Sequence, residues 1–307
     1  MDRRLFHALR ISSEAALSVL YGQGWPARLA RRLGVHPDPV PLRVKLTLPA
    51  PHPCPPLRVA FASDFHAGPT THPDVIRAAC RTLLEAQPDL ILLGGDFVSL
   101  HERAVGDLLT ELSRLEARLG KFAVLGNHDY WVDHRRLASQ LAAAGYTLLT
   151  NRNVRLRPPA HHVWVCGLDD SDEGVPDADA AFAGADGVRL VVMHSPDGLA
   201  AIGNRAFDLA LCGHTHGGQI CLPGGRVVHV PPGMYTRRYA AGHFPVGPNG
   251  AGALIVSRGV GCSGVPVRAS AAPDVVVCDI HWRQVETSSH GRQTQAGEEA
   301  ELPQLSG

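Results

Sequence analysis

The chain has 307 residues, of which 45% are hydrophobic and 19% charged, a composition typical of a globular protein with a sizeable core. Lysine plus arginine and aspartate plus glutamate both total 29, so the formal net charge is zero. This balance argues against a general nucleic-acid-binding function, which depends on a basic surface that neutralises backbone phosphates.

The first 56 residues are predicted to be an extension in front of the main domain. Residues 1–34 have the pattern of a helix, and Gly34 is a plausible stop signal. Residues 35–56 are rich in proline, and only the segment 43–48 alternates like a strand. The start of the chain reads as a basic amphipathic helix, for which two roles stay open: peripheral contact with a membrane surface, or packing on the protein's own body.

From residue 57 the pattern becomes that of an α/β domain, which we expect to end near residue 283. Apolar runs too short for helices recur, as is typical of strands buried on both faces. They occupy residues 57–64, 89–96, 121–129, 162–170, 188–195 and 208–216. Helices are predicted at about 73–87, 101–119 and 132–144, and more strands at 219–281. The alternation predicts sheets sandwiched between helices. The polar tail, 284–307, is predicted to be disordered.

The seven cysteines are dispersed and contain no CxxC pair. Neither a disulfide framework nor a cysteine-based zinc site is therefore predicted. No apolar run approaches the roughly 18 to 20 residues that a membrane span needs. Together these features favour a cytoplasmic location, with a membrane-peripheral one left open by the basic amphipathic start of the chain.

Polar residues of metal-binding type follow the apolar runs. They are Asp64, His66, Asp96, Asn127, His128, Asp129, His194, His214 and His216. Because ligands of α/β sheets bind at the carboxyl ends of strands, we expect these side chains to converge in one cleft. A single one would more often be structural or cap a turn, but five such blocks in order predict a metal centre. Imidazole and carboxylate ligands suit Mn, Fe, Zn or Co, and their number suits a dinuclear centre.

The sequence blocks themselves resemble those of the calcineurin-like metallophosphoesterases. The blocks are SDFHAG (63–68), GGDFV (94–98), GNHD (126–129), MHS (193–195) and GHTHGGQ (213–219). The blocks CGLDD (166–170) and GVGCSGVPVR (259–268) are most similar to the YkuE-like bacterial branch. This resemblance implies a four-layer α/β/β/α sandwich, in which two mixed β-sheets are flanked by helices. It also implies a metal-dependent hydrolase of phosphate esters or phosphoanhydrides.

The resemblance further implies a role for each site residue. Two divalent transition-metal ions would be bound, the first by Asp64, His66, Asp96 and His216, and the second by Asp96, Asn127, His194 and His214. Asp96 would bridge the ions together with a hydroxide, which would attack phosphorus. His128 would donate a hydrogen bond or proton to the phosphoryl or leaving oxygen, and Asp129 would orient His128.

Three functional hypotheses stay open. The first is a phosphoesterase that acts on a small-molecule or lipid-linked phosphate. The second is a UDP-2,3-diacylglucosamine pyrophosphatase of lipid A synthesis, which a membrane-binding N-terminus would suit. The third is a non-catalytic binding or scaffolding module, which the intact set of expected ligands disfavours. Nucleic acid is not an expected partner, and no prediction follows for the oligomeric state.

Substrate-binding residues do not follow from the sequence pattern. Several arginines are candidates for phosphate contact, although a solvated surface charge is the favoured interpretation for each: Arg103, Arg152, Arg237, Arg238 and Arg268. Four histidines have no motif around them and are predicted to be structural: His161, His162, His229 and His243.

Overall fold

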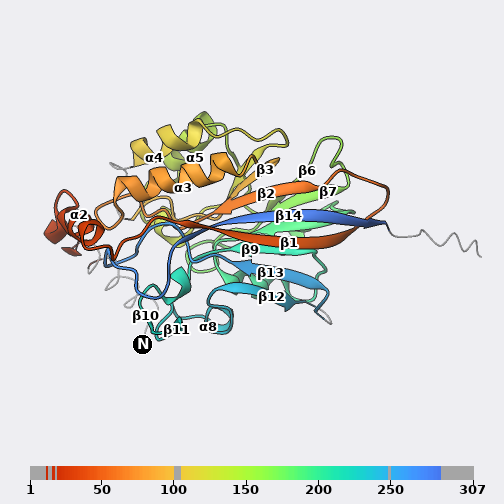
Figure 1. Cartoon of the computed structure of the whole chain (residues 1–307). Helices are drawn as coiled ribbons and strands as arrows, with labels where there is room; N and C mark the ends of the chain where they lie inside the picture. Colours follow the sequence, from red (N-terminus) through yellow and green to blue (C-terminus); the bar gives the residue numbers. More distant parts are fainter. Residues whose placement is uncertain (1–11, 13–15, 18, 100–104, 248–249, 285–307) are drawn as a thin grey trace, which may run out of the picture.

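Two six-stranded sheets lie face to face at the centre of the computed structural model (Figure 1). The structure describes residues 12, 16–17, 19–99, 105–247 and 250–284. The first sheet has the order β1 (Val40–Ala50), β14 (Asp274–Gln284), β2 (Leu57–Ala62), β3 (Leu90–Leu93), β4 (Lys121–Ala123), β5 (Thr147–Leu148). The second has the order β12 (Gly242–Val246), β13 (Gly252–Val256), β9 (Leu209–Cys212), β8 (Val188–Val192), β7 (Val163–Gly167), β6 (Arg152–Arg155).

Both sheets are mixed. In the first, β2, β3, β4 and β5 run parallel, whereas β14 is antiparallel to β2 and parallel to β1. In the second, β7, β8, β9 and β13 run parallel, and the two edge strands β6 and β12 are antiparallel to their neighbours. The two short strands β10 (Cys221–Leu222) and β11 (Arg226–Val227) form a separate hairpin.

Helices cover the outer face of each sheet. The first sheet is covered by α3 (Pro73–Glu85), α4 (Val105–Ser113) and α5 (His134–Ala143), which lie above it in Figure 1. The second is packed against α6 (Ala178–Phe182), α7 (Leu199–Ile202) and Tyr235 of α8 (Met234–Arg238). These layers confirm the predicted fold, two mixed sheets flanked by helices in an α/β/β/α sandwich.

The period of a strand explains why each apolar run is continuous. In β3, Leu90 and Leu92 face the core between the two sheets, whereas Ile91 and Leu93 face the helices. Successive side chains of a strand point to opposite faces, so a strand with helices on one side and a sheet on the other needs apolar residues at every position. The same alternation places Val191 of β8 on the outer side, away from Leu190 and Val192.

The predicted helices are present, with one boundary moved. The helix expected at 101–119 is observed as α4 and ends at Ser113. It ends early because the chain turns toward the first sheet: the Leu119 amide donates to the Asp89 carbonyl, and the Leu119 side chain is buried between the sheets. The start of that prediction falls on residues 100–104, outside the described residues.

At the N-terminal side, α2 (Trp25–Arg32) lies inside the segment 1–34 that was predicted to be helical, of which residues 1–11, 13–15 and 18 are outside the described residues. The strand predicted at 43–48 is part of the longer β1, which pairs along its whole length with β14. The predicted disordered tail falls almost entirely outside the described residues. Over the described part of the chain, no helix has the length and apolar character needed to cross a membrane.

Candidate metal centre

The predicted ligands come from loops that follow five strands of the two sheets. Those after β2, β3 and β4 carry Asp64 and His66, Asp96, and Asn127 to Asp129, the last on the short helix η2 (Asn127–Trp131). In the second sheet, the loop after β8 carries His194, and the loop after β9 carries His214 and His216. All nine predicted site residues are buried, and none is more than 5% exposed. The centre is therefore built where the carboxyl ends of both sheets meet.

One group of ligand atoms is formed by Asp64, His66 and His216. The Nε2 atoms of His66 and His216 lie 3.0 Å apart, and His216 Nε2 is 3.5 Å from Asp64 Oδ1. The Oδ2 atom of Asp96 lies 3.4 Å from His66 Nε2. These are the four residues that the family resemblance assigns to the first metal ion.

A second group is formed by Asp96, His194 and His214. His194 Nε2 lies 3.3 Å from Asp96 Oδ2, 3.1 Å from His214 Nδ1 and 3.2 Å from Asn127 Oδ1. The same carboxylate oxygen of Asp96 therefore lies next to a histidine of each group. This is the position expected for a residue shared by two ions.

The backbone of these loops adopts a rare conformation. Five of the seven predicted metal ligands have a positive φ, between 44° and 70°: Asp64, His66, Asp96, His214 and His216. Non-glycine residues seldom adopt this left-handed conformation, which costs free energy that the surrounding structure must offset. Such residues cluster at functional sites, because the strained turn aims a side chain that a regular strand end would direct elsewhere.

Two glycines allow the loops to approach each other closely. A Cβ atom on Gly213 would lie 2.1 Å from Asp64 Oδ2, and one on Gly126 would lie 2.2 Å from Asp96 Oδ1. Both contacts are far shorter than van der Waals distance. A side chain at either position would therefore displace a carboxylate of the centre.

Other groups hold the histidine rings in place. His194 Nδ1 donates to the Gly94 carbonyl at 2.8 Å, which directs Nε2 at Asp96 and Asn127. His214 Nε2 lies 3.6 Å from Asp172 Oδ2, on the side of the ring away from His194. Partners of this kind fix the tautomer and orientation of metal-binding histidines.

Arg268 has a structural role in this centre. Its guanidinium is buried, lies 3.1 Å from His216 Nδ1, and donates to the carbonyls of His216, Arg258 and Gly261. Arg268 was a candidate for phosphate contact, but these hydrogen bonds already use the donors of its guanidinium. Arg152, another such candidate, donates to the Leu148 carbonyl, and Arg103 lies outside the described residues.

His128 and Asp129 have separate hydrogen-bond partners. His128 Nδ1 donates to the Ser99 carbonyl at 2.9 Å, and the ring lies edge-on to His66 with a centroid separation of 4.6 Å. The Asp129 carboxylate accepts backbone N–H bonds from Asp96, Phe97 and Gly126. Asp129 thus ties the loops after β3 and β4 together, and its effect on His128 is indirect. The carbonyl of Ser99 holds the ring nitrogen that we expected Asp129 to hold.

The charges of the buried groups suit a cation. Burial alone would raise the pKa of Asp96, but the charges of His194 and His128 outweigh it and hold that pKa well below its usual range. Burial, with the nearby Arg268 adding to it, lowers the pKa of His216, and burial likewise lowers that of His66, so both rings are neutral. The neutral imidazoles of His66 and His216 and the ionised carboxylate of Asp96 are donors of the kind that Mn, Fe, Zn and Co prefer.

The buried atoms also test whether the residues fit metal ions. Among the described residues, the Nε2 atoms of His66 and His194 lie next to other ligand atoms of the centre. Such an arrangement is costly without a cation, because buried polar groups are normally paired. The residues present therefore fit divalent ions.

Sequence reasoning missed two carboxylates beside the centre, Asp170 and Asp172. Asp170 is buried, which raises its pKa to about 6, and its Oδ1 accepts the N–H groups of Asp172 and Glu173. Both lie in the loop after β7. Asp170 ends the run 162–170, so the signal that found the other residues was present for Asp170, whereas Asp172 lies beyond that run.

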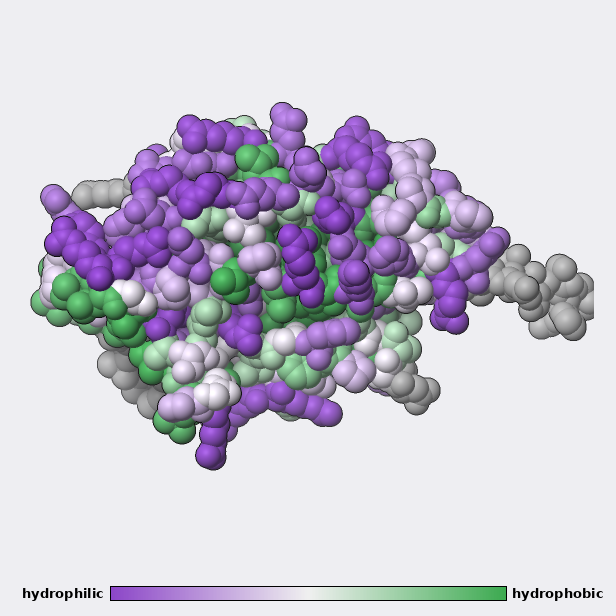
Figure 2. Space-filling model, viewed as in Figure 1, coloured by the Kyte–Doolittle hydropathy of each residue, from purple (hydrophilic) through white to green (hydrophobic). Residues whose placement is uncertain are grey.

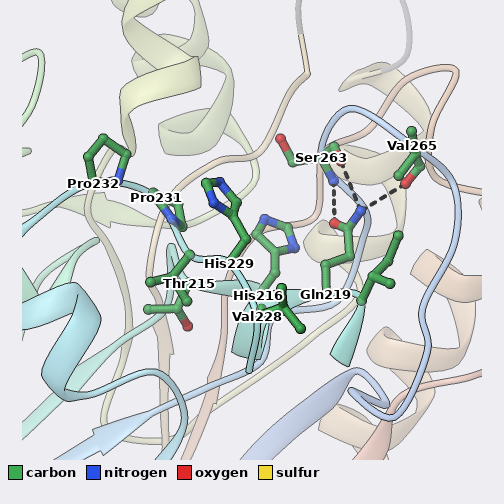
Figure 3. Close-up of a pocket in the computed structure, with 12 residues that line it drawn as sticks. Thr215, His216, Gln219, Val228, His229, Pro231, Pro232, Ser263 and Val265 are labelled. Atoms are coloured by element: carbon green, nitrogen blue, oxygen red, sulfur yellow. Dashed lines mark hydrogen bonds between the residues drawn. The ribbon is translucent and has the colours of Figure 1, made fainter. Parts of the chain in front are cut away.

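An apolar pocket with a volume of about 450 Å³ opens beside His216. Figure 3 shows His229, Pro231 and Pro232 on one side of His216, and Gln219 bonded to Ser263 and Val265 on the other. His229 is exposed and was predicted to be merely structural, yet it lines this pocket. The pocket provides room for an apolar part of a substrate next to the ligand cluster.

Comparison with known proteins identifies relatives. Residues 57–218 match the family model described as calcineurin-like phosphoesterase. The chain is 32% identical to phosphodiesterase YaeI of Escherichia coli over 73% of this chain and 82% of that protein. It is 29% identical to the metallophosphoesterase YkuE of Bacillus subtilis over 90% of this chain and 96% of that one. A solved 5'-nucleotidase precursor from Thermus thermophilus is 15% identical, with a TM-score of 0.44 over 73% of this chain and 55% of that chain.

Proposed function

Because the chain belongs to the calcineurin-like phosphoesterase family of hydrolases, we propose that it hydrolyses a phosphate ester or phosphoanhydride at a centre for two divalent metal ions. The observation that carries this proposal is the shared carboxylate. Asp96 Oδ2 lies 3.4 Å from His66 Nε2 and 3.3 Å from His194 Nε2, between two groups that each contain enough ligand atoms for one ion.

Two divalent ions held there would supply positive charge for the phosphoryl oxygens and activate a water molecule as nucleophile. The chain's own residues would do the rest. His128 is fixed through Nδ1 by the Ser99 carbonyl, so its Nε2, when protonated, can donate to the leaving oxygen. The new bond joins the water oxygen to phosphorus, the ester or anhydride bond breaks, and the leaving oxygen receives the proton.

A phosphodiester is the substrate class that we favour. One relative at 32% identity carries the name phosphodiesterase. The apolar pocket beside His216 could hold the second organic group that a diester has and a monoester lacks. The intact ligand set disfavours the alternative of a non-catalytic scaffold, because a scaffold has no need for buried metal-binding side chains.

A lipid-linked pyrophosphate, such as UDP-2,3-diacylglucosamine, is the second candidate substrate. The apolar pocket supports it, and so does α2, where Trp25, Leu29 and the C-cap residue Leu33 are exposed next to arginines. Figure 2 shows hydrophobic residues at the end of the molecule that carries α2. Basic helices with exposed apolar side chains bind membrane surfaces, where an acylated substrate is found.

The test is a hydrolysis screen of the full-length protein loaded with Mn²⁺. Bis-p-nitrophenyl phosphate, p-nitrophenyl phosphate and UDP-2,3-diacylglucosamine represent diesters, monoesters and lipid-linked pyrophosphates. We expect the diester to be cleaved fastest. Release of UMP from the third substrate as the fastest reaction would instead support the lipid-linked candidate. A metal-replete protein that cleaves none of the three would contradict the proposed function.

The acid is tested in the same assay by His128→Ala. Turnover should fall by about 10²–10⁴-fold, the usual contribution of general acid–base catalysis, while the metal content stays unchanged. His243→Ala is the matched control, because His243 is exposed on β12 and has no place in the centre. Equal turnover of the two variants would show that His128 does not act as the acid.

A further inference from the structure

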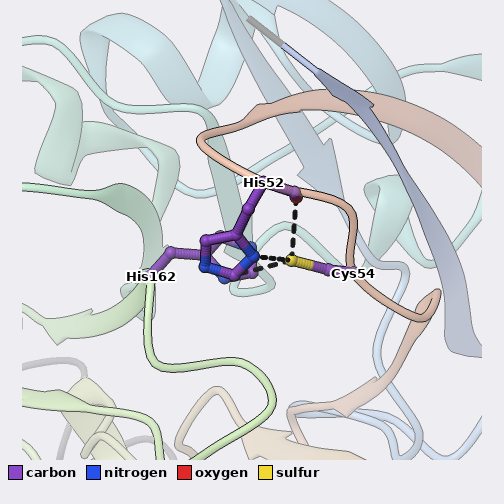
Figure 4. A group of neighbouring side chains, drawn as sticks. All are labelled: His52, Cys54 and His162. Atoms are coloured by element: carbon purple, nitrogen blue, oxygen red, sulfur yellow. Dashed lines mark hydrogen bonds between the residues drawn. The ribbon is translucent and has the colours of Figure 1, made fainter.

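A second cluster of metal-binding side chains lies outside the catalytic centre. It consists of His52, Cys54 and His162 (Figure 4). One ligand atom from each residue lies within 4.8 Å of the other two. His52 and Cys54 belong to the connection between β1 and β2, and His162 directly precedes β7. The cluster is therefore at the amino ends of β2 and β7, whereas the catalytic ligands follow the carboxyl ends of their strands.

The spacing of the three ligand atoms suits a tetrahedral ion. Cys54 Sγ lies 3.0 Å from His52 Nδ1 and 3.7 Å from His162 Nδ1. Zinc–sulfur bonds of about 2.3 Å and zinc–nitrogen bonds of about 2.0–2.1 Å at a tetrahedral angle place sulfur and nitrogen about 3.6 Å apart. The two observed separations lie on either side of this value, and Figure 4 shows the sulfur directed at both rings.

The rings are held in this arrangement by the surrounding protein. His162 is buried, and its ring lies edge-on to Trp282 with a centroid separation of 4.6 Å. Trp282 Nε1 in turn donates to the carbonyl of Pro55, the residue that follows Cys54. One end of β14 thus fixes both the connection that carries Cys54 and the ring of His162.

Binding of a cation would require a change of protonation at the cysteine but not at His162. Burial lowers the pKa of His162, and the neighbouring His52 and His161 lower it further, so this ring is neutral. Burial raises the pKa of the Cys54 thiol, which donates to the His52 carbonyl when no cation is bound. A bound cation converts such a thiol to a thiolate and releases its proton to solvent.

We propose that His52, Cys54 and His162 form a structural binding site for a zinc-like divalent ion, separate from the catalytic centre. Thiolate and imidazole ligands together select zinc over the harder Mg²⁺ and Mn²⁺ ions. The ion would tie the connection between β1 and β2, in the first sheet, to the segment that enters β7, in the second. The fourth coordination position would be filled by water.

Cobalt substitution tests this site independently of hydrolysis. A Co²⁺ ion bound to a thiolate gives an intense near-ultraviolet charge-transfer band, and the groups of catalytic ligands contain no cysteine. We expect the full-length protein to show the band, and to saturate it with one equivalent of Co²⁺ at this site. Asp96→Asn, which removes the shared catalytic ligand, should keep the band. A failure of the proposed function and a failure of this site are thereby distinguishable.

The variants identify the cysteine. Cys54→Ser should lose the band, and His162→Gln should weaken Co²⁺ binding at this site by at least about tenfold, since outer partners of ligands alone are worth that much. Cys221→Ser is the matched control, because Cys221 also donates to a backbone carbonyl but belongs to no ligand group. Circular dichroism checks that each variant folds. Absence of the band in the unmodified protein, or its persistence in folded Cys54→Ser, would overturn the proposal.

Discussion

At the scale of single residues, Asp172 illustrates how a side chain can act on the centre without binding metal. Its Oδ2 lies 3.6 Å from His214 Nε2, and His214 Nδ1 faces His194. A carboxylate at this position favours the tautomer that keeps the proton on Nε2 and the lone pair on Nδ1, toward the other ligands. Asp172 is half-buried, so we expect it to orient the His214 ring through its charge and not through packing contacts.

Replacing Asp172 by asparagine tests this role. We expect Asp172→Asn to weaken metal binding by about 10–100-fold, the usual effect of removing an outer partner of a histidine ligand. Turnover at saturating Mn²⁺ should change much less. Titration with Mn²⁺ followed by activity measures both quantities. Asp179→Asn is the control, since Asp179 forms only an exposed ion pair with Arg205. Unchanged Mn²⁺ affinity in Asp172→Asn would show that the ring is held by other contacts.

At the scale of elements, α3 shows how one helix face supports the catalytic loops. Pro73 occupies the first turn, and the side chain of His72 caps it by accepting the Asp74 amide at 3.2 Å. Leu83 is fully buried against the first sheet, whereas the next residue, Leu84, is 57% exposed. The helix therefore packs through one stripe of side chains onto the strands whose ends carry Asp64 and Asp96.

A pair of truncations measures that packing. Leu83→Ala should lower the free energy of unfolding by about 2–5 kcal/mol, because it removes buried apolar contacts and leaves a cavity. Leu84→Ala removes the same side-chain atoms from an exposed position, and it should change the free energy of unfolding by less than about 0.5 kcal/mol. Chemical denaturation at fixed metal concentration gives both values. Similar losses for the two variants would mean that α3 does not pack as described.

The loops after the strands depend on conformation as much as on composition. Gly126 and Gly213 leave room where a Cβ atom would strike the carboxylates of Asp96 and Asp64. Asp96 and Asp64 themselves adopt a positive φ, which cannot be predicted for an aspartate from a single sequence. Which residues come together at the centre was therefore predictable, but the turn that aims each side chain was not.

At the scale of the whole molecule, the centre joins the two sheets. Asp64, His66 and Asp96 follow strands of the first, and His194, His214 and His216 follow strands of the second. Metal ions held between them would link the two halves of the sandwich. A ligand that binds only the folded state stabilises that state, so metal binding and folding are coupled.

Metal removal tests this coupling. The protein treated with EDTA should have a lower Tm, and Mn²⁺ should restore it. A free Mn²⁺ concentration of about 100 times Kd should add about 2.7 kcal/mol of stability for each ion. Mn²⁺ is the suitable ion because a thiolate-containing site binds it poorly. Asp96→Asn is the control and should show a much smaller shift. A Tm that is independent of Mn²⁺ in the unmodified protein would contradict the coupling.

The sequence by itself determined the fold class and the nine residues that gather at the centre. Both depend on local patterns: apolar runs buried on two faces, followed at once by metal-binding side chains. Tertiary structure decided which residues outside those patterns belong together. Asp172 reaches His214 from the loop after β7, Arg268 is buried and bonded to His216, and His162 meets Cys54 across 108 positions of sequence. Such contacts arise from the packing of two sheets, which leaves no periodic signal along the chain.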